Sequence, residues 1–260
     1  PQAKNEAQNL GEVTQSQTGI INGTDVKAED KLAESIVAVY DAYTGQLCTG
    51  SLLPSNLVLT AAHCVGPFPE AMAVFFDVQP NEKSEYRMVD KLEVSPYWET
   101  RQMEDKNTGD IALLHFVGAV PGKYKPSTFL PMGSQKLIKP GTTVVVAGYG
   151  LTDGAKKIGA GKLRTTKIKI ADHKFSASEV SLDQSQGTGA CHGDSGGPAY
   201  IEAGGKYYLW GITSRGLNDE ANDCSKQAVY TNALYYKSWL NRVANKLTTA
   251  LGSPESAKQQ

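Results

Sequence analysis

Long apolar runs are missing from this 260-residue chain. No stretch approaches the roughly 18 consecutive apolar residues that a membrane-spanning helix needs, so we expect no membrane span. A charge excess of either sign is also missing, because 26 basic residues face 27 acidic ones and the formal net charge is -1. Proteins that bind nucleic acids usually carry a clear basic excess, so we expect no nucleic-acid partner. The sequence also shows no internal repeat.

Cysteine is scarce, with four residues, and no Cys-x-x-Cys pair occurs. The missing pair weakens a zinc-binding or redox-motif interpretation. Four cysteines allow three disulfide pairings, and spacing does not choose among them. Two explanations stay open at this point: disulfides in an oxidising compartment, or buried free thiols in a cytosolic protein.

The two ends of the chain differ from the part between them. Residues 1–19 contain almost no apolar side chains beyond Leu10 and Val13, so we interpret them as a propeptide or a disordered tail. Residues 252–260 have nothing to bury and predict a second disordered tail. Pro1 is not an initiator methionine, and we therefore expect any export signal to have been removed already.

Between the tails, short β-rich runs alternate with turn signals from Ser35 to Ala233, a spacing typical of an all-β sandwich or barrel. Alternation is clearest over residues 167–170, where Lys and Ile take turns and predict a strand with one wet face. A stretch rich in proline and glycine, from Gly118 to Gly141, predicts the boundary between two halves.

Helical spacing is found only near the C-terminus. Apolar residues recur there every four positions, which predicts one helix that packs one face on the rest of the molecule. They are Tyr235, Trp239, Val243, Leu247 and Leu251.

Three segments contain the groups that peptide hydrolysis by a serine requires: a hydroxyl nucleophile, an imidazole that takes and returns its proton, and a carboxylate that orients the imidazole. They are TAAHC with His63, GDIALL with Asp110 and GDSGGP with Ser195. Each residue alone has an ordinary structural explanation, as a surface histidine, a turn-forming aspartate or a loop serine. Chance does not readily explain all three in this order with a cysteine beside His63.

In order and separation, these segments resemble the chymotrypsin–trypsin family of serine endopeptidases, and the resemblance covers nearly the whole chain outside the two tails. It implies an all-β fold of two six-stranded antiparallel Greek-key β-barrels packed together, with a C-terminal α-helix. It also implies a secreted or periplasmic hydrolase without a cofactor, of the bacterial type with two disulfides. We expect a peptidase domain over residues 20–247, with barrels over about 30–120 and 135–233 and the helix over about 234–250.

The resemblance also implies roles for single residues. The triad would be His63, Asp110 and Ser195, and the oxyanion hole would consist of the backbone N–H groups of Gly193 and Ser195. The disulfides would join Cys48 to Cys64 beside His63, and Cys191 to Cys224 at the wall of the specificity pocket.

The family's substrate-binding positions fall on small, polar or basic residues of this chain. They are Gly189, Ala190, His192, Ser214, Arg215, Gly216 and Ala228. Gly189 takes the base of the pocket, where trypsin-like members carry an aspartate, so we expect an open apolar pocket for medium or large hydrophobic side chains. His192 at the pocket rim keeps a Glu-preferring peptidase as an alternative.

Arg215 stands where most relatives have an aromatic residue. We expect it to pair with Asp219 or Glu220 on the surface rather than to contact substrate. The stretch TGIING around Ile20 resembles the family's activation junction, which implies a zymogen cleaved between Gly19 and Ile20. The amino group freed at Ile20 would then pair with Asp194, the residue before the nucleophile.

The resemblance implies protein or peptide substrates and protein protease inhibitors as partners, and we expect a monomer. Some relatives bind calcium near Asp77, Glu82 and Glu85, but their spacing here does not support a metal site. A rival hypothesis is a catalytically silent family member that acts as a binding module, although this sequence keeps all three triad residues. An esterase with a nucleophile elbow would need an α/β chain, which the β-rich context contradicts.

Overall fold

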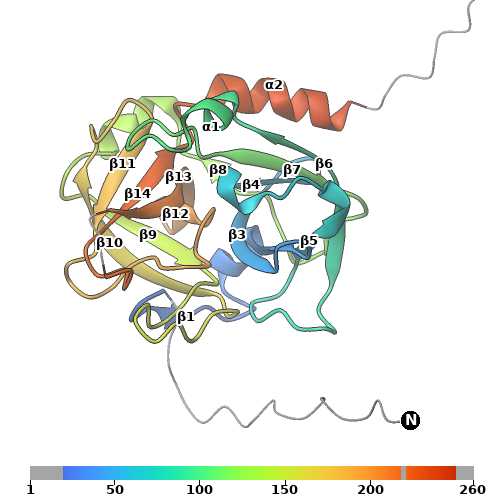
Figure 1. Cartoon of the computed structure of the whole chain (residues 1–260), viewed down its shortest axis with the longest axis horizontal. Coiled ribbons are helices and arrows are strands. Elements are labelled where there is room, and N and C mark those ends of the chain that lie inside the picture. Colours follow the sequence, from blue (N-terminus) through green and yellow to red (C-terminus); the bar gives the residue numbers. More distant parts are fainter. Residues whose placement is uncertain (1–19, 218–220, 250–260) are drawn as a thin grey trace, which may run out of the picture.

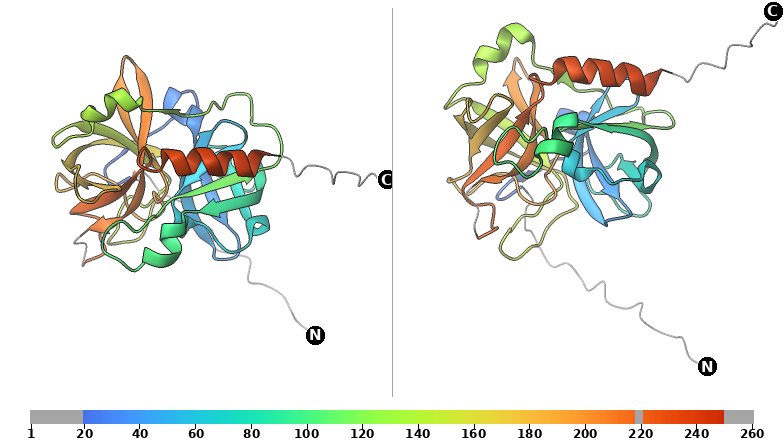
Figure 2. Two further views of the ribbon diagram at one scale, coloured as in Figure 1. Left: turned by 90° about the horizontal axis from the view of Figure 1, so that it is seen from above. Right: turned by 45° about the horizontal axis from the view of Figure 1, so that its top comes forward.

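The computed structural model of the chain describes residues 20–217 and 221–249 (Figure 1). Both expected tails, as well as Asp219, Glu220 and Leu251, lie outside these residues. The described part contains mostly β-strands, arranged as two lobes that lie side by side with a helix across them (Figure 2).

The first lobe is a closed barrel in the order β2-β3-β4-β7-β6-β5, with antiparallel pairing throughout. Its strands are β2 (Ile36–Asp41), β3 (Gln46–Leu53), β4 (Leu57–Thr60), β5 (Met72–Phe75), β6 (Tyr86–Val94) and β7 (Ala112–Phe116). Every second residue of these strands points inward, and the apolar interior contains Val37, Leu52, Val58 and Leu114.

The second lobe closes in the order β9-β10-β11-β14-β13-β12, because β9 pairs with both β10 and β12. Its strands are β9 (Thr143–Gly148), β10 (Arg164–Asp172), β11 (Glu179–Asp183), β12 (Pro198–Ala203), β13 (Lys206–Leu217) and β14 (Gln227–Asn232). Two short strands extend it, β1 (Thr24–Asp25) on β10 and β8 (Thr128–Phe129) on β13. The prediction of two six-stranded barrels is confirmed.

Burial explains the alternation seen in the sequence. In β10, Ile168 and Ile170 are buried in the second barrel, whereas Lys167 and Lys169 are exposed. One further apolar cluster joins the barrels to each other and to the C-terminal helix. It includes Leu59 and Leu113 of the first barrel, Val145 and Leu209 of the second, and Trp239 of the helix.

The C-terminal helix α2 (Lys237–Thr248) lies across the molecule near β6 and β7 (Figures 1 and 2). Trp239, Val243 and Leu247 are buried as predicted. Tyr235 was expected on the same face but is 54% exposed, because the helix begins only after Tyr236 and this second tyrosine is buried in its place. No helix in the described ranges is long and apolar enough to cross a membrane.

A second helix, α1 (Pro96–Arg101), was not predicted. Ser95 caps it, since its hydroxyl accepts a hydrogen bond from the Tyr97 N–H at 3.3 Å, and Pro96 takes the first helical position. Both choices are typical of a helix start. The remaining helical pieces are 3₁₀ turns: η1 (Lys31–Ser35), η2 (Ala62–Cys64), η3 (Pro69–Ala71) and η4 (Met132–Leu137).

Candidate active site

Residues of both barrels line one cleft of about 430 Å³. His63 reaches it from η2, directly after β4, and Asp110 from the segment just before β7. Ser195 reaches it from the loop that precedes β12. The cleft therefore brings together the three residues that the motifs singled out.

Asp110 and His63 are directly hydrogen-bonded. Oδ2 of Asp110 lies 2.8 Å from Nδ1 of His63, and its Oδ1 accepts a hydrogen bond from the His63 backbone N–H at 3.0 Å. The hydroxyl of Ser214 donates to the same Oδ2 at 2.6 Å. Burial opposes the charge on Asp110, but the imidazole and these hydrogen bonds outweigh it and hold the pKa of the carboxyl below its ordinary value.

His63 responds in the opposite direction. Burial lowers the pKa of its imidazole, yet the neighbouring Asp110 carboxylate more than compensates and the net pKa is raised. Among the described residues no hydrogen bond links His63 to Ser195, a contact that in apo enzymes often tightens only when substrate binds. The imidazole is therefore oriented by Asp110, with Nε2 left for a reacting group.

Two backbone N–H groups beside Ser195 point away from the protein's own acceptors. The carbonyl of His192 accepts from the Leu151 N–H at 2.8 Å, so the Gly193 N–H, on the opposite side of that planar peptide, faces the other way. The carbonyl of Asp194 accepts from Gly197 N–H at 2.8 Å, which turns the Ser195 N–H outward in the same manner. Neither N–H donates a hydrogen bond within the described part of the chain. Gly193 has φ +96°, a conformation that favours glycine.

Thr49 of β3 holds this loop from the other barrel. Its hydroxyl donates to the Gly193 carbonyl at 2.9 Å, and its N–H donates to the Ser195 carbonyl at 2.8 Å. The Tyr149 N–H donates to the same hydroxyl at 3.1 Å. A buried side chain of the first barrel thus fixes the nucleophile loop of the second.

The pocket beside Ser195 is built differently from the sequence-based expectation. Gly189 does not line the cleft, because the amide of Gln184 occupies the space in front of it: a Cβ added to Gly189 would lie 2.3 Å from Cδ of Gln184. The Gln184 amide donates to the carbonyls of Ala190 at 3.1 Å and Cys224 at 2.9 Å, and its oxygen accepts from the Ala190 N–H at 2.7 Å. Gln184 therefore takes the place at the pocket base that was expected for Gly189.

The other predicted substrate positions do line the cleft. They are Ala190, His192, Ser214, Arg215, Gly216 and Ala228. Strand β13 has a bulge at Ser214, where the register with β14 shifts between Thr213 and Arg215. Its pairing with β12 ends at Ile212, and the backbone of Thr213 still bonds to Gly196 and Gly197. Beyond Thr213, this edge of β13 has the form that strand addition by an extended peptide requires.

Arg215 has a partner that the sequence did not suggest. Its Nη1 lies 2.8 Å from Oε1 of Glu179, and its Nη2 donates to the Asp105 carbonyl at 2.6 Å. The predicted partners, Asp219 and Glu220, lie outside the described residues. At the pocket rim, Nε2 of His192 lies 2.9 Å from Oδ1 of Asn222.

Asp194 is fully buried beneath the nucleophile loop, and its carboxylate accepts hydrogen bonds at 2.8 Å from the N–H groups of Gly150 and Cys191. Burial outweighs these bonds and raises the pKa of Asp194 to about 7. Ile20 is also fully buried, and the next residue, Ile21, pairs with Gly189 through two backbone hydrogen bonds of 2.9 and 3.3 Å.

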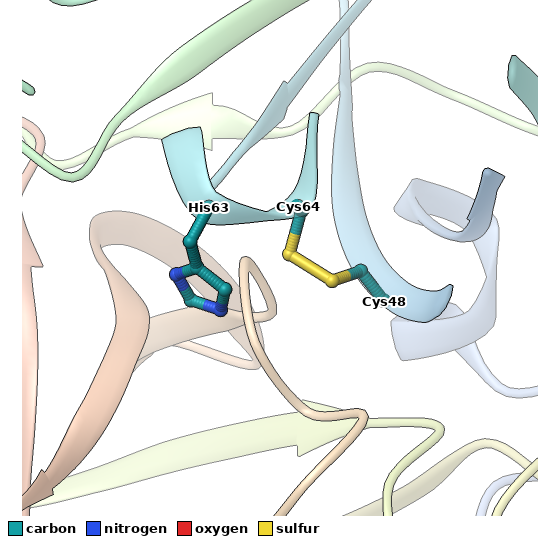
Figure 3. A group of neighbouring side chains, drawn as sticks. All are labelled: Cys48, His63 and Cys64. Atoms are coloured by element: carbon teal, nitrogen blue, oxygen red, sulfur yellow. A yellow bond between two sulfur atoms is a disulfide. The ribbon is translucent and has the colours of Figure 1, made fainter. Parts of the chain in front are cut away.

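Both expected disulfides are present: Cys48 with Cys64, and Cys191 with Cys224. Figure 3 shows the first of them joining η2 to β3 directly beside His63. The sulfur atoms near His63 and His192 belong to these bridges, so they are not available as thiolate ligands for a metal ion. The second bridge forms part of the cleft wall. Both point to an oxidising compartment.

Several cleft residues escaped the sequence analysis. They are Trp98, Gln102, Thr108, Gln184 and Asn222. A signal existed for Trp98, because Ser95 followed by Pro96 marks a helix start, and this helix sets the indole 6.3 Å from the His63 ring. No local pattern marked Gln184 or Glu179, each of which has an essential partner far along the chain, Cys224 or Arg215.

Comparison with known proteins agrees with the geometry of the site. A family model described as Trypsin matches residues 20–240. Chymotrypsin-like elastase family member 1 of Canis lupus familiaris is 30% identical over 212 residues, which cover 75% of this chain and 80% of the relative. Its human counterpart is 29% identical over 211 residues, with the same coverage. Human kallikrein-8 is 29% identical over 209 residues and 76% of each chain. The chain belongs to the trypsin family and is a serine endopeptidase.

Proposed function

We propose that the chain hydrolyses peptide bonds with Ser195 as nucleophile, His63 as general base and Asp110 as the orienting carboxylate. The observation that carries the proposal is the hydrogen-bonded series Ser214, Asp110 and His63 in the cleft that also contains Ser195. With Nδ1–H held by Asp110, Nε2 of His63 takes the proton from Ser195 as its Oγ attacks the scissile carbonyl. His63 returns this proton to the leaving amine, and water then attacks the acyl-enzyme by the same route.

The oxyanion formed in each step needs donors that are already oriented. The outward N–H groups of Gly193 and Ser195 support this role, because they have no other acceptor in the described residues. In other serine proteases, loss of one such donor costs about 2.7–4 kcal/mol of transition-state stabilisation.

A fluorophosphonate probe tests the nucleophile, since it forms a covalent bond with an activated serine. We expect the activated protein to be labelled, Ser195→Ala to lose both labelling and peptidase activity, and His63→Ala to lose activity by about 10⁴-fold. The exposed Ser55 provides a matched control, and Ser55→Ala is expected to behave as the parent. Peptidase activity near the parent level in a folded Ser195→Ala protein would refute the assignment.

For specificity, we propose a neutral pocket that accepts medium or large apolar side chains, best those of Leu and Met. The residues that line the pocket wall, Ala190, Gly216 and Ala228, are small and leave room for such side chains, which supports this preference. Both donors of the Gln184 amide are already used, so the floor offers nothing to a carboxylate, and it has no charge for Lys or Arg. Because Gln184 fills the place in front of Gly189, the longest aromatic side chains have less room than in the pocket expected from the sequence.

Chromogenic peptides that differ only in the residue before the cleaved bond test the pocket. We expect kcat/KM to be highest for Leu and Met, lower for Phe and Tyr, and lowest for Lys, Arg and Glu. The alternative, a Glu-preferring peptidase, rests on His192, whose Nε2 is engaged by Asn222. A higher kcat/KM for Glu than for Leu would favour that alternative, and a preference for Arg would refute the neutral pocket.

We further propose that the chain is an exported zymogen, activated by cleavage between Gly19 and Ile20. The buried Asp194 supports this, because its hydrogen bonds in the described residues come from two backbone amides, and neither these nor the charge of Arg164 keeps its pKa from rising. A new amino group would supply a cation for this carboxylate. The two disulfides support export. N-terminal sequencing of active protein alongside a time course of activity tests the idea, with Ile20 as the expected first residue. Full activity in an intact chain that begins at Pro1 would contradict it.

The rival hypothesis from the sequence was a catalytically silent binding module. The same labelling experiment separates the two, because a silent family member binds its partner without reacting with a fluorophosphonate. Substrate proteins and protein protease inhibitors are the partners that the proposed peptidase implies, and gel filtration at several concentrations tests the expected monomer.

A further inference from the structure

Glu179 is a buried acid at the start of β11, with 1% of its surface exposed. Its Oε2 accepts hydrogen bonds from the N–H of Asn107 at 2.7 Å and the hydroxyl of Ser176 at 3.0 Å. Its Oε1 accepts from the hydroxyl of Thr108 at 3.1 Å and from Nη1 of Arg215 at 2.8 Å. A carboxylate with this many donors is ionised, and although burial opposes the charge, Arg215 and these bonds keep the pKa of Glu179 below its ordinary value.

Three of these partners, Asn107, Thr108 and Arg215, belong to the two segments beside the proposed catalytic dyad. Asn107 and Thr108 lie just before Asp110 in the chain, so Glu179 fixes the backbone that leads into this residue. Arg215 follows Ser214 on β13, and its Nη1 also lies 3.3 Å from the Ser214 hydroxyl, which donates to Asp110. One ion pair, between the buried Glu179 and the partly exposed Arg215, therefore contacts both the segment that carries Asp110 and the strand that hydrogen-bonds to it.

The pair also affects the charge around His63. In the described part of the chain, Asp110 and Arg215 are the charged side chains that act on this imidazole, and the exposed His192 lines the same cleft. Arg215 disfavours the protonated imidazole, which opposes Asp110. On the far side, Glu179 faces Arg215 and Tyr236, and burial raises the pKa of that phenol to about 12, so it stays neutral.

We propose that Glu179 and Arg215 act together as positioning residues for the Asp110–His63 dyad: the pair joins the segment before Asp110 to β13, and Glu179 neutralises a cation that would otherwise make His63 a weaker base. The inference rests on the proposed triad. Neither residue is assigned contact with the reacting atoms. They act on His63 indirectly, through the positions of Asp110 and Ser214 and through the charge near the imidazole.

Removing the negative charge and removing the positive charge of this pair are expected to shift the His63 pKa in opposite directions. A purely structural role for the pair would not produce opposite shifts. In the activated enzyme, Glu179→Gln leaves the Arg215 cation unbalanced, so we expect the His63 pKa to fall by about half a unit. Arg215→Gln removes the cation, so we expect the same pKa to rise by about half a unit. The double variant removes both charges, and we expect it to return close to the parent value.

Two readouts follow this shift: the acidic limb of the pH profile of kcat/KM, and an NMR titration of the His63 ring, which distinguishes it from His192. Both single variants are also expected to lower kcat by about 10- to 100-fold, with a smaller change in KM. Arg215→Lys keeps the charge and is expected to keep the parent pKa. The exposed pair of Lys167 and Glu202 supplies a control, and Glu202→Gln is expected to change neither quantity.

Shifts in the same direction, or no shift in either single variant, would overturn the proposal. If Glu179→Gln does not fold, Arg215→Gln and Arg215→Lys decide the question, because only the first is expected to raise the His63 pKa. Fluorophosphonate labelling of the parent separates this failure from failure of the proposed function. A labelled, active parent whose variants lack the opposite shifts contradicts the positioning role alone.

Discussion

Asp110 and Asp194 are both buried acids, with 2% and 0% of their surfaces exposed. Their pKa values are nevertheless shifted in opposite directions. Asp110 lies next to an imidazole and a serine hydroxyl, and its pKa is lowered. Asp194 has two backbone N–H groups, and its pKa is raised to about 7. Burial penalises both carboxylates, and what separates them is that Asp110 is hydrogen-bonded to a group that becomes positively charged. The backbone amides and the charge of Arg164 together do not offset the cost of burying Asp194.

The largest expected effect comes from removing the charge of Asp110 while keeping its shape. Asp110→Asn leaves His63 without an acceptor for Nδ1–H and favours the wrong tautomer, so we expect kcat to fall by about 10⁴-fold. Kinetics on a peptide amide and circular dichroism of the variant check this. A second substitution, Ser195→Ala, is expected to add little to the loss, since the triad acts as a unit. A loss below tenfold in a folded protein would contradict the role of Asp110.

A buried acid can also be added where none exists. Gln184→Glu keeps the oxygen that accepts from Ala190 but replaces the amide that donates to two carbonyls, so the second oxygen of the new carboxyl faces these carbonyls without a donor. A substrate lysine would supply the missing cation, and we expect kcat/KM for Lys relative to Leu to rise by about 10- to 100-fold. Gln184→Leu is the uncharged control and is expected not to gain activity on Lys. An unchanged ratio in Gln184→Glu would show that Gln184 is not the pocket floor.

The raised pKa of Asp194 makes the stability of the folded chain depend on pH. Its pKa of about 7 in the folded chain exceeds the ordinary value of 3.8, so the folded state binds this proton more tightly than the unfolded state. The resulting stabilisation is complete below about pH 4 and is lost as the pH rises to about 7. In the uncleaved Ser195→Ala chain, we expect Asp194→Asn to raise Tm by roughly 5 °C more at pH 8 than at pH 4.

Thermal unfolding across this pH range measures the difference, and groups common to both proteins cancel in the comparison. In the proposed activation, cleavage before Ile20 frees an amino group that pairs with Asp194, so we expect Asp194→Asn to become destabilising in the cleaved protein. A Tm difference that is independent of pH in the uncleaved chain would contradict the raised pKa.

The smallest effect is expected at an exposed acid. Glu202 pairs with Lys167 at 2.8 Å, but both side chains face solvent. Solvent screening leaves little net interaction, so Glu202→Gln is expected to change Tm by less than about 2 °C at any pH from 5 to 8. A shift as large as that of Asp194→Asn would mean that burial does not explain the difference among the acids.

The sequence predicted the triad segments because each motif is local and its residues need no distant partner to be recognised. The same holds for the strands with clear apolar runs in the first barrel. Strands β11 and β12 had no such signal, since EVSLD and PAYIEA are short and polar at one end, and the expectation of six strands in the second barrel came from the family resemblance. Gln184 and Glu179 were missed for a related reason: they acquire their roles from partners 40 and 36 positions away, Cys224 and Arg215.

Thr49 ties the geometry of the nucleophile loop to the docking of the two barrels. Its N–H and hydroxyl reach across to the carbonyls of Ser195 and Gly193, so part of what holds the loop of the proposed oxyanion donors comes from the other barrel. A chain with one barrel formed and the other still unfolded contains every catalytic residue but does not have an assembled site. We therefore expect activity only in chains in which both barrels are folded and in contact.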